Sequence, residues 1–480
     1  MPGNLIKINP RDNVAVTLTS LVKGDVVNIK GDVITILTEV PAGHKVALTD
    51  IKKGEKIVKY GQAVGRAAED IAIGSALHIF NMKEESLMDA PYRFNRKTSE
   101  EAAERLLMSK AYYSSTSIPR ISAFKRTNGE IGLRNQLWIV SLSPEAEGKA
   151  LEAKLWAEST VSIPDGVKLW KRLENGNDDT AEMVLSNLVK NPNAGAVIVI
   201  AESDEHLESF MDMVGDWKGI AYFTVDEEEK IRTAIRMAEG KIRGEKRTSV
   251  PMSEIRIGLK CSSSDSLSGI TANPLAGMIT DEIIAMGGTA VLSETSEVFG
   301  AERLILDRSE NEEVFEKAAD LFTSYKLHVR SAGREPYEKL SIENRRGGIT
   351  TITERSLGGI QKSGSSPVSG VLRFYERLET PGLNLLPGPG TDEVSVQLQT
   401  AAGCQLIIYT TGDGQVPEIP MTMVVISTRK GIMDTHPETV DFNAGRLLRE
   451  EATVVTESLM ADIIQIASGE KMTKRELSGN

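Results

Sequence analysis

Cysteine is almost absent from this sequence, which has only Cys261 and Cys404 among its 480 residues. Two such distant thiols cannot supply the disulfide framework of a small secreted domain, and their scarcity is typical of a reducing compartment. The five histidines include no HExxH pair. No apolar run approaches the roughly 20 residues of a membrane span, and the N-terminal residues lack the apolar core of a secretion signal. We therefore expect a cytoplasmic protein that does not contact a membrane.

Positive charge is also in deficit, because 56 Lys and Arg face 68 Asp and Glu for a net charge of −12. Nucleic acid and anionic lipid would repel the average surface of such a chain. A small anionic substrate remains compatible, since local cations can reverse the field inside a cleft. The glycine-rich segments GPGTDE and TTGDG lack a P-loop lysine and a full GxGxxG frame, so they do not indicate a nucleotide site.

The residue pattern, and the secondary structure that it predicts, differs between regions of the chain. Residues 1–82 contain short β-branched runs separated by glycines, which predicts a small, mostly β domain. Residues 83–120 are polar and charged, contain one helical piece, and resemble a linker. Residues 121–250 and 251–480 alternate strands with helices, which predicts two α/β domains with largely parallel sheets. In the last domain we expect a helix capped by Asn273, with Pro274 in its first turn and Gly287 at its end.

Polar residues follow four expected strands of the last domain. IRIGLK runs into CSSSD, TAVLSE ends at Glu294, LNLL opens into PGPGTD, and QLIIY into TTGDG. Ligands of open parallel sheets bind beyond the carboxyl ends of the strands, so these loops are candidates for a binding site. Connecting loops are also commonly made of such residues, and this second interpretation stays open.

One long block and several shorter ones resemble the altronate/galactarate dehydratase family. The block GLKCSSSDSLSGITANPLAGMITDEIIAMGGTAVLSETSEVFGAE at 258–302 is similar to that family's GLKCGGSD, SGI.ANP and SET.E.FGAE segments. Four further segments resemble parts of the family pattern and follow one another in the same order as in the family. They are FKRTNGEIGLRN at 124–135, the stretch 343–364, TTGDG at 410–414 and DFNAG at 441–445. The N-terminal region resembles the family's appended β-clip module of SAF type.

The resemblance implies a reaction and its requirements. It implies loss of water from an aldonic or aldaric acid to give a 2-keto-3-deoxy acid, with Fe²⁺ or else Mn²⁺ or Mg²⁺. A proton next to a carboxylate is very weakly acidic, so the developing enolate needs a metal, and a base and an acid must move the protons. We expect a small sugar acid as partner and a homo-oligomeric protein.

The resemblance and the strand-end positions give twelve candidate residues. Candidates for catalysis are Lys260, Asp265, Glu294 and Glu297; for substrate binding Arg134, Asn135, Asn273 and Thr411; and for metal binding Cys261, His44, His78 and Glu302.

Structural roles compete with several of these hypotheses. Cys261 is alternatively a buried structural thiol, and Arg134 an ordinary surface charge. Glu302 is alternatively paired with a nearby cation on a solvated face. His44 and His78 are alternatively hydrogen-bonded residues of a module that closes over the cleft or contacts another subunit.

The chain departs from the family pattern at positions whose usual residues could bind a metal. Ser143 stands where the central domain usually has a cysteine, Phe80 replaces the second histidine of a VH.HN segment, and Asp413 stands where arginine is common. Two alternatives to a dehydratase follow from these departures. One is a sulfolactate-type sulfo-lyase, and the other a sugar-acid-binding protein without turnover.

Overall fold

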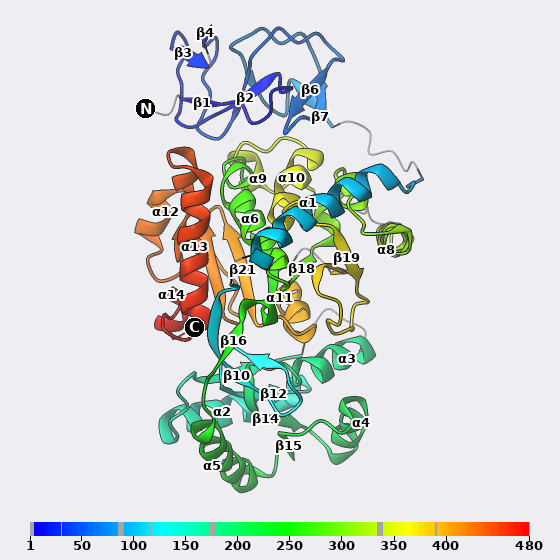
Figure 1. Cartoon of the computed structure of the whole chain (residues 1–480), viewed down its shortest axis with the longest axis vertical. Helices are drawn as coiled ribbons and strands as arrows, with labels where there is room; N and C mark the ends of the chain where they lie inside the picture. Colours follow the sequence, from blue (N-terminus) through cyan, green and yellow to red (C-terminus); the bar gives the residue numbers. More distant parts are fainter. Residues whose placement is uncertain are drawn as a thin grey trace.

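Three parts follow one another along the long axis of the molecule (Figure 1). The computed structural model describes residues 4–29, 31–84, 91–115, 117–172, 178–262, 264–333, 339–388 and 391–479. The N-terminal β domain lies at one end, the C-terminal domain in the middle, and the second domain at the other end. Parts of two expected site loops, Ser263, Pro389 and Gly390, fall outside the described residues.

The N-terminal domain is built from short antiparallel strands, as its glycine-punctuated runs predict. One sheet has the order β1-β2-β5-β8, and two smaller sheets have the orders β3-β4 and β6-β7-β9. The strands are β1 Leu5–Ile6, β2 Val14–Thr17, β3 Val26–Ile29, β4 Asp32–Thr35, β5 Lys45–Ala47, β6 Lys56–Lys59, β7 Gln62–Ala67, β8 Ala76–Leu77 and β9 Met82–Lys83.

The expected linker contains a long helix that packs on the C-terminal domain. Helix α1 (Arg96–Ser115) crosses that domain near α6 (Figure 1). The hydroxyl of Tyr113 donates a hydrogen bond to the carboxylate of Glu282 on α6. This segment is therefore anchored rather than a free connection.

The second domain has the parallel sheet that its strand–helix alternation predicts. Its strand order is β13-β12-β14-β15, with every neighbour parallel. Strand β13 was not predicted from the sequence, because its four residues VKLW are too few to be distinguished from the surrounding loop. The elements are β12 Gln136–Ser141, α2 Pro144–Thr160, β13 Val167–Trp170, α3 Asp178–Leu188, β14 Ala194–Ala201, α4 Asp204–Val214, β15 Ile220–Thr224 and α5 Glu228–Gly244.

An antiparallel ribbon joins the second and C-terminal domains. Strand β10 (Arg120–Lys125) pairs with β11 (Ile131–Gly132) and with β16 (Thr248–Pro251). The segment around 248–251, expected to be only a boundary, is therefore a strand. The chain leaves and re-enters the C-terminal domain through neighbouring strands.

The C-terminal domain is organised around a seven-stranded sheet of order β19-β20-β18-β17-β21-β22-β23. Every neighbouring pair is parallel, so all carboxyl ends meet at one edge. Within the described residues, no helix is long and apolar enough to cross a membrane. The strands are β17 Arg256–Ser262, β18 Thr289–Ser293, β19 Val368–Val371, β20 Gly382–Leu386, β21 Leu406–Thr411, β22 Met423–Ser427 and β23 Phe442–Asn443.

Helices cover both faces of this sheet, and the first of them begins differently from the prediction. Helix α6 starts at Ala272 after Thr271, so Asn273 is not its cap. Gly287 follows the helix with a φ of 95°, which confirms its expected role as terminator. The helices are α6 Ala272–Ala285, α7 Glu302–Leu306, α8 Glu312–Ser331, α9 Ile342–Arg346, α10 Ile352–Gly359, α11 Asp392–Ala401, α12 Lys430–Thr435, α13 Ala452–Ala467 and α14 Lys474–Leu477, with the 3₁₀ turn Ile360–Ser363 after α10.

Candidate active site

A polar cavity of about 390 Å³ lies at the carboxyl edge of the C-terminal sheet. Strand β17 brings Cys261 to its wall, the turn after β18 brings Glu297, and the start of α11 brings Asp392. The strand-end loops thus meet as the sequence predicts, because neighbouring parallel strands end at the same edge. The lining residues are Cys261, Ser262, Ser264, Glu297, Lys339, Ser341, Glu343, Asn344, Arg355, Asp392, Asp413 and Gln415.

Two buried lysines hold Glu294 behind this wall. Both Lys260 and Lys362 form ion pairs with Glu294, one to each carboxylate oxygen. Lys260 also lies 2.9 Å from Asp392. Burial alone would raise the pKa of Glu294, but the two ammonium charges outweigh burial and lower that pKa. The carboxylate therefore stays ionised.

The backbone at Glu294 is strained. Its φ of 116° lies in the left-handed region, which costs a non-glycine residue about 1–3 kcal/mol. The turn aims the side chain back under the end of β17, where both lysines contact it. Strain of this kind persists only where surrounding contacts enforce it, and here the two ion pairs do so.

Cys261 is 3% exposed and lies among charged groups. The Lys362 Nζ atom donates to its sulfur at 2.8 Å, and carboxylate oxygens of Glu294 and Glu297 lie 3.8 and 3.7 Å from that sulfur. Burial and the neighbouring Glu294 raise the pKa of the Cys261 thiol to about 12. The sulfur is consequently a thiol at neutral pH unless a further cation approaches it.

Glu297 differs from Glu294 in having no ion pair among the described residues. Burial and the charge of Glu294 raise the pKa of Glu297. Ligand atoms of Cys261, Glu294 and Glu297 all lie within 4.8 Å of one another. One sulfur and two carboxylates at this spacing can hold a divalent metal ion.

The sequence did not single out Arg355, which lines the cavity, or Lys362, which contacts Cys261 and Glu294 behind its wall. Arg355 is 5% exposed and lines the cavity, yet its Nε and Nη2 atoms have no hydrogen-bond partner in the described part of the chain. Leaving two buried guanidinium nitrogens without partners is costly, and an anion in the cavity would satisfy them. Both residues belong to the stretch 343–364, whose similarity to the family was the available signal.

Three other predicted residues lie at this edge but have structural contacts. Asp265 accepts a backbone hydrogen bond from Ser268 at 2.6 Å. Asn273 donates to the Gly358 carbonyl oxygen and accepts from Thr410. The hydroxyl group of Thr411 donates a hydrogen bond to Asp413 and accepts one from the backbone N–H of Gly414. None of the three lines the cavity, and among the described residues none has a side-chain hydrogen bond or ion pair to the group around Cys261, so we leave them out of the proposed site.

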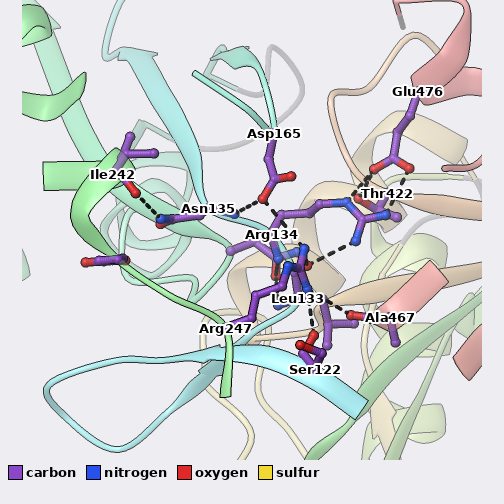
Figure 2. A network of polar contacts seen from close by, with 12 residues as sticks. Ser122, Leu133, Arg134, Asn135, Asp165, Ile242, Arg247, Thr422, Ala467 and Glu476 are labelled. Atoms are coloured by element: carbon purple, nitrogen blue, oxygen red, sulfur yellow. Dashed lines mark hydrogen bonds and ion pairs between the residues drawn. The ribbon is translucent and has the colours of Figure 1, made fainter. Parts of the chain in front are cut away.

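Arg134 and Asn135 lie in a different polar network (Figure 2), near the amino ends of the strands of the C-terminal sheet. Arg134 forms an ion pair with Glu476 at 2.8 Å, and Glu476 also accepts from Thr422, just before β22. Asn135 donates to the Ile242 carbonyl oxygen and accepts from Arg126. These two substrate-binding candidates therefore lie away from Cys261, because the 124–135 segment ends beside the amino ends of the strands.

Arg134→Met should therefore destabilise the protein without weakening substrate binding. Removing one partner of a buried ion pair leaves the other charge uncompensated, and we expect the free energy of unfolding to fall by about 3–5 kcal/mol. Urea unfolding measures this loss, with Arg243→Met, which removes an exposed helix ion pair, as the control. A large rise in KM with unchanged stability would instead return Arg134 to the substrate site.

The remaining predicted metal ligands lie outside the group around Cys261. Glu302 is held by Lys326 at 2.9 Å and by the hydroxyl of Tyr92 at 3.1 Å, rather than by a cation on its own helix face. The His44 Nε2 atom lies 3.1 Å from the Arg346 carbonyl oxygen on α9. His78 stacks on His44, with ring centroids 5.7 Å apart. The histidines thus belong to the contact between the N-terminal domain and α9.

A buried ion triad fixes the N-terminal domain beside the cavity. Lys45 and Lys59 both lie 2.8 Å from carboxylate oxygens of Glu354, and all three side chains are at most 1% exposed. Lys59 also donates to the Ser266 hydroxyl. Because Glu354 directly precedes Arg355, the N-terminal domain helps to hold the guanidinium in place.

Stability should fall steeply in acid. The neighbouring cations outweigh burial and lower the pKa of both Glu354 and Glu476 from 4.5 to about 2. A depressed folded-state pKa stabilises the protein above pH 4.5, and this contribution is lost as the pH falls toward 2. Each group gives a slope of about 1.4 kcal/mol per pH unit. Urea unfolding between pH 4.5 and 2.5 measures the loss, and a flat profile would contradict it.

The protein is thus an α/β protein in which a thiol, two carboxylates, two ammonium groups and a guanidinium gather at the carboxyl ends of a parallel sheet. Comparison with known proteins identifies the family. Residues 3–85 match the altronate/galactarate dehydratase SAF domain, residues 123–244 the second domain of D-galactarate dehydratase/altronate hydrolase, and residues 252–480 the D-galactarate/altronate dehydratase C-terminal domain.

Three curated relatives have names that state an activity. Altronate dehydratase of Bacillus subtilis is 34% identical over 97% of this chain and 95% of its own length. Galactarate dehydratase (L-threo-forming) of Escherichia coli is 28% identical over 98% and 93%. The beta subunit of (2R)-sulfolactate sulfo-lyase of Chromohalobacter salexigens is 28% identical over 74% and 94%. The chain belongs to the altronate/galactarate dehydratase family.

Proposed function

We propose that this protein dehydrates a sugar acid of the aldonate class to a 2-keto-3-deoxy acid. The observation that carries the proposal is the unpaired Arg355 guanidinium in the cavity that Cys261 and Glu297 also line. A planar guanidinium binds a carboxylate through two parallel hydrogen bonds. Altronate dehydratase among the more similar relatives supports the same reaction class.

The residues fit the divalent metal that the family implies. Cys261, Glu294 and Glu297 would hold it, and their mixed sulfur and oxygen ligands suit Fe²⁺. A metal bound there would stabilise negative charge developing on the substrate carboxylate. The cation would share the site with Lys362, which contacts both Cys261 and Glu294. His44, His78 and Glu302 take no part in this proposed metal site.

Lys362 and Asp392 supply the proton chemistry of the proposed reaction. Burial alone would lower the pKa of Lys362, but Cys261 and Glu294 outweigh it and raise that pKa. Lys362 is thus an ammonium that can donate a proton to the departing hydroxyl group. Asp392, a carboxylate on the cavity wall beside Lys260, is positioned to accept the proton from the carbon next to the carboxylate.

The charge of the cavity favours a substrate with one carboxylate. Its lining includes the cations Lys339 and Arg355 but four acids, Glu297, Glu343, Asp392 and Asp413. Arg355 would bind one carboxylate of the substrate. A second substrate carboxylate would lie near the negative charges of these acids. An aldonate ends in a neutral hydroxyl group there, whereas an aldarate ends in a carboxylate.

An anaerobic assay with Fe²⁺ and a panel of aldonates, aldarates and sulfolactate tests the proposed function. We expect a 2-keto acid from at least one aldonate and no sulfite from sulfolactate. Sulfite release would make the protein a sulfo-lyase. A ligand-dependent rise in melting temperature with no product from any compound would make it a binding protein.

Asp413→Asn should reduce the preference of the protein for an aldonate over an aldarate. Losing one like charge near the far end of the substrate should raise kcat/KM for an aldarate about fivefold, corresponding to about 1 kcal/mol. The value for the aldonate should change less than twofold, because its far end is neutral. Glu418→Gln, in the neighbouring exposed loop, serves as the control. An equal change for both substrates would contradict the proposed orientation.

A further inference from the structure

A second and larger cavity, of about 660 Å³, lies in the second domain. Its walls come from the β10–β11 hairpin, the starts of β14 and β15, and the end of α5. These are the amino ends of the parallel strands, whereas the site around Cys261 lies at carboxyl ends in another domain. We call this second cavity the amino-edge cleft.

The amino-edge cleft is positively charged in a protein of net charge −12. Six cations line it against three acids, Glu130, Asp216 and Glu245. Glu245 pairs with Arg126, itself one of the six, and Glu130 pairs with Arg256 and Arg377 outside the lining, which leaves five lysines against Asp216. The lining cations are Lys125, Arg126, Lys190, Lys218, Lys241 and Lys246.

Lys190 is the most informative of these cations. It is half-buried, and within the ranges that the structure describes its ammonium group forms no ion pair. Burial and the nearby charge of Arg377 lower the pKa of Lys190. A half-buried ammonium without an ion pair of its own is unfavourable, and an anion in the cleft would compensate it.

The cleft also has a planar wall and a rigid base. Trp217 lines it and packs against the guanidinium of Arg377, whose Cζ atom lies 5.7 Å from the ring centroid. Lys241 is held in place by donating to the Gly195 carbonyl oxygen at 2.7 Å. Lys125, Lys218 and Lys246 are exposed and without an ion pair among the described residues, so they can converge on a ligand.

We propose that the amino-edge cleft binds a small polyanion, a metabolite with two or more phosphate or carboxylate groups. Such a ligand would compensate Lys190 and the exposed lysines together, which a single surface carboxylate cannot do. The cleft is built against the start of the strand that carries Cys261, because Glu130 on its wall accepts from Arg256, the first residue of β17. The proposal concerns a site separate from that of the dehydration.

Calorimetric titration of the full-length protein with pyrophosphate and with citrate, at constant ionic strength, tests this proposal. We expect saturable binding of at least one probe, one equivalent per chain. Lys190→Ala with Lys246→Ala should weaken that binding at least tenfold. The pair Lys23→Ala with Lys110→Ala removes the same charge from exposed positions elsewhere and should change it less than twofold.

The variant Arg355→Met distinguishes binding at the amino-edge cleft from binding at the cavity beside Cys261. Binding to the amino-edge cleft should persist in this variant, because the substitution lies in the other cavity. Binding of citrate alone or pyrophosphate alone would support the proposal and identify the preferred anionic group. No binding of either probe, equal weakening by both double substitutions, or loss of binding in Arg355→Met would each overturn it.

Discussion

Lys362→Met is expected to reduce kcat about 10³-fold, because it removes the proposed proton donor for the departing hydroxyl group. The ammonium of Lys362 lies 2.8 Å from the Cys261 sulfur and also pairs with Glu294. Its surroundings keep it charged, and no other lysine contacts this thiol among the described residues. Steady-state turnover of the preferred aldonate measures the effect, and Lys317→Met, in an exposed helix pair, serves as the control.

Lys362→Arg distinguishes proton transfer from simple charge balance. Arginine keeps the positive charge beside Glu294 and should preserve folding, but it does not give up its proton in the working pH range. We expect its kcat to be reduced as severely as that of Lys362→Met, with melting temperature closer to the wild type. Retention of more than a tenth of wild-type kcat would show that Lys362 acts through its charge alone.

Arg355→Met is expected to lower kcat/KM by about 10²–10³, since a desolvated charge-assisted contact contributes roughly 3–4 kcal/mol. The same substitution should leave the ligand-free protein as stable as the wild type or more stable. The unpaired Nε and Nη2 atoms contribute a desolvation penalty of about 1–3 kcal/mol, which methionine removes. Gain of stability with loss of activity is the behaviour of a group held for a ligand.

Two measurements separate this interpretation from a structural role for Arg355. Urea unfolding without ligand gives the stability change, and the aldonate-induced rise in melting temperature gives binding. We expect that rise to disappear in Arg355→Met and to return partly in Arg355→Lys. A fall in stability of several kcal/mol in the ligand-free variant would mean that the guanidinium supports the fold.

The sequence predicted the fold class and the edge of the sheet at which the polar cavity lies, because both follow from local pattern. Alternating strands and helices imply a parallel sheet, and the strand ends at Cys261 and Glu294 meet since β17 and β18 are neighbours. The same pattern could not show that Glu294 takes a left-handed backbone conformation or that two lysines are buried beside it. Burial of a lysine depends on partners from distant elements, which no local spacing reveals.

Long-range pairing also explains why the sequence could not show where Arg134 lies. Its partner Glu476 is 342 residues away, near the amino ends of the strands rather than their carboxyl ends. Arg355 and Lys362 lie in a helix and a 3₁₀ turn rather than in strand-end loops, so the rule that located the cavity did not point to them. In each case the residue type was informative and the tertiary partner decided its role.

The central claim is that Arg355 anchors the carboxylate of a sugar acid beside Cys261 and Glu297. A crystal structure of the full-length protein soaked anaerobically with Mn²⁺ and an aldonate tests it most directly. The account predicts carboxylate oxygens within about 3 Å of the Arg355 Nε and Nη2 atoms, at charge-assisted hydrogen-bond distance. An aldonate bound at another place, with the Arg355 guanidinium still unpaired, would contradict it.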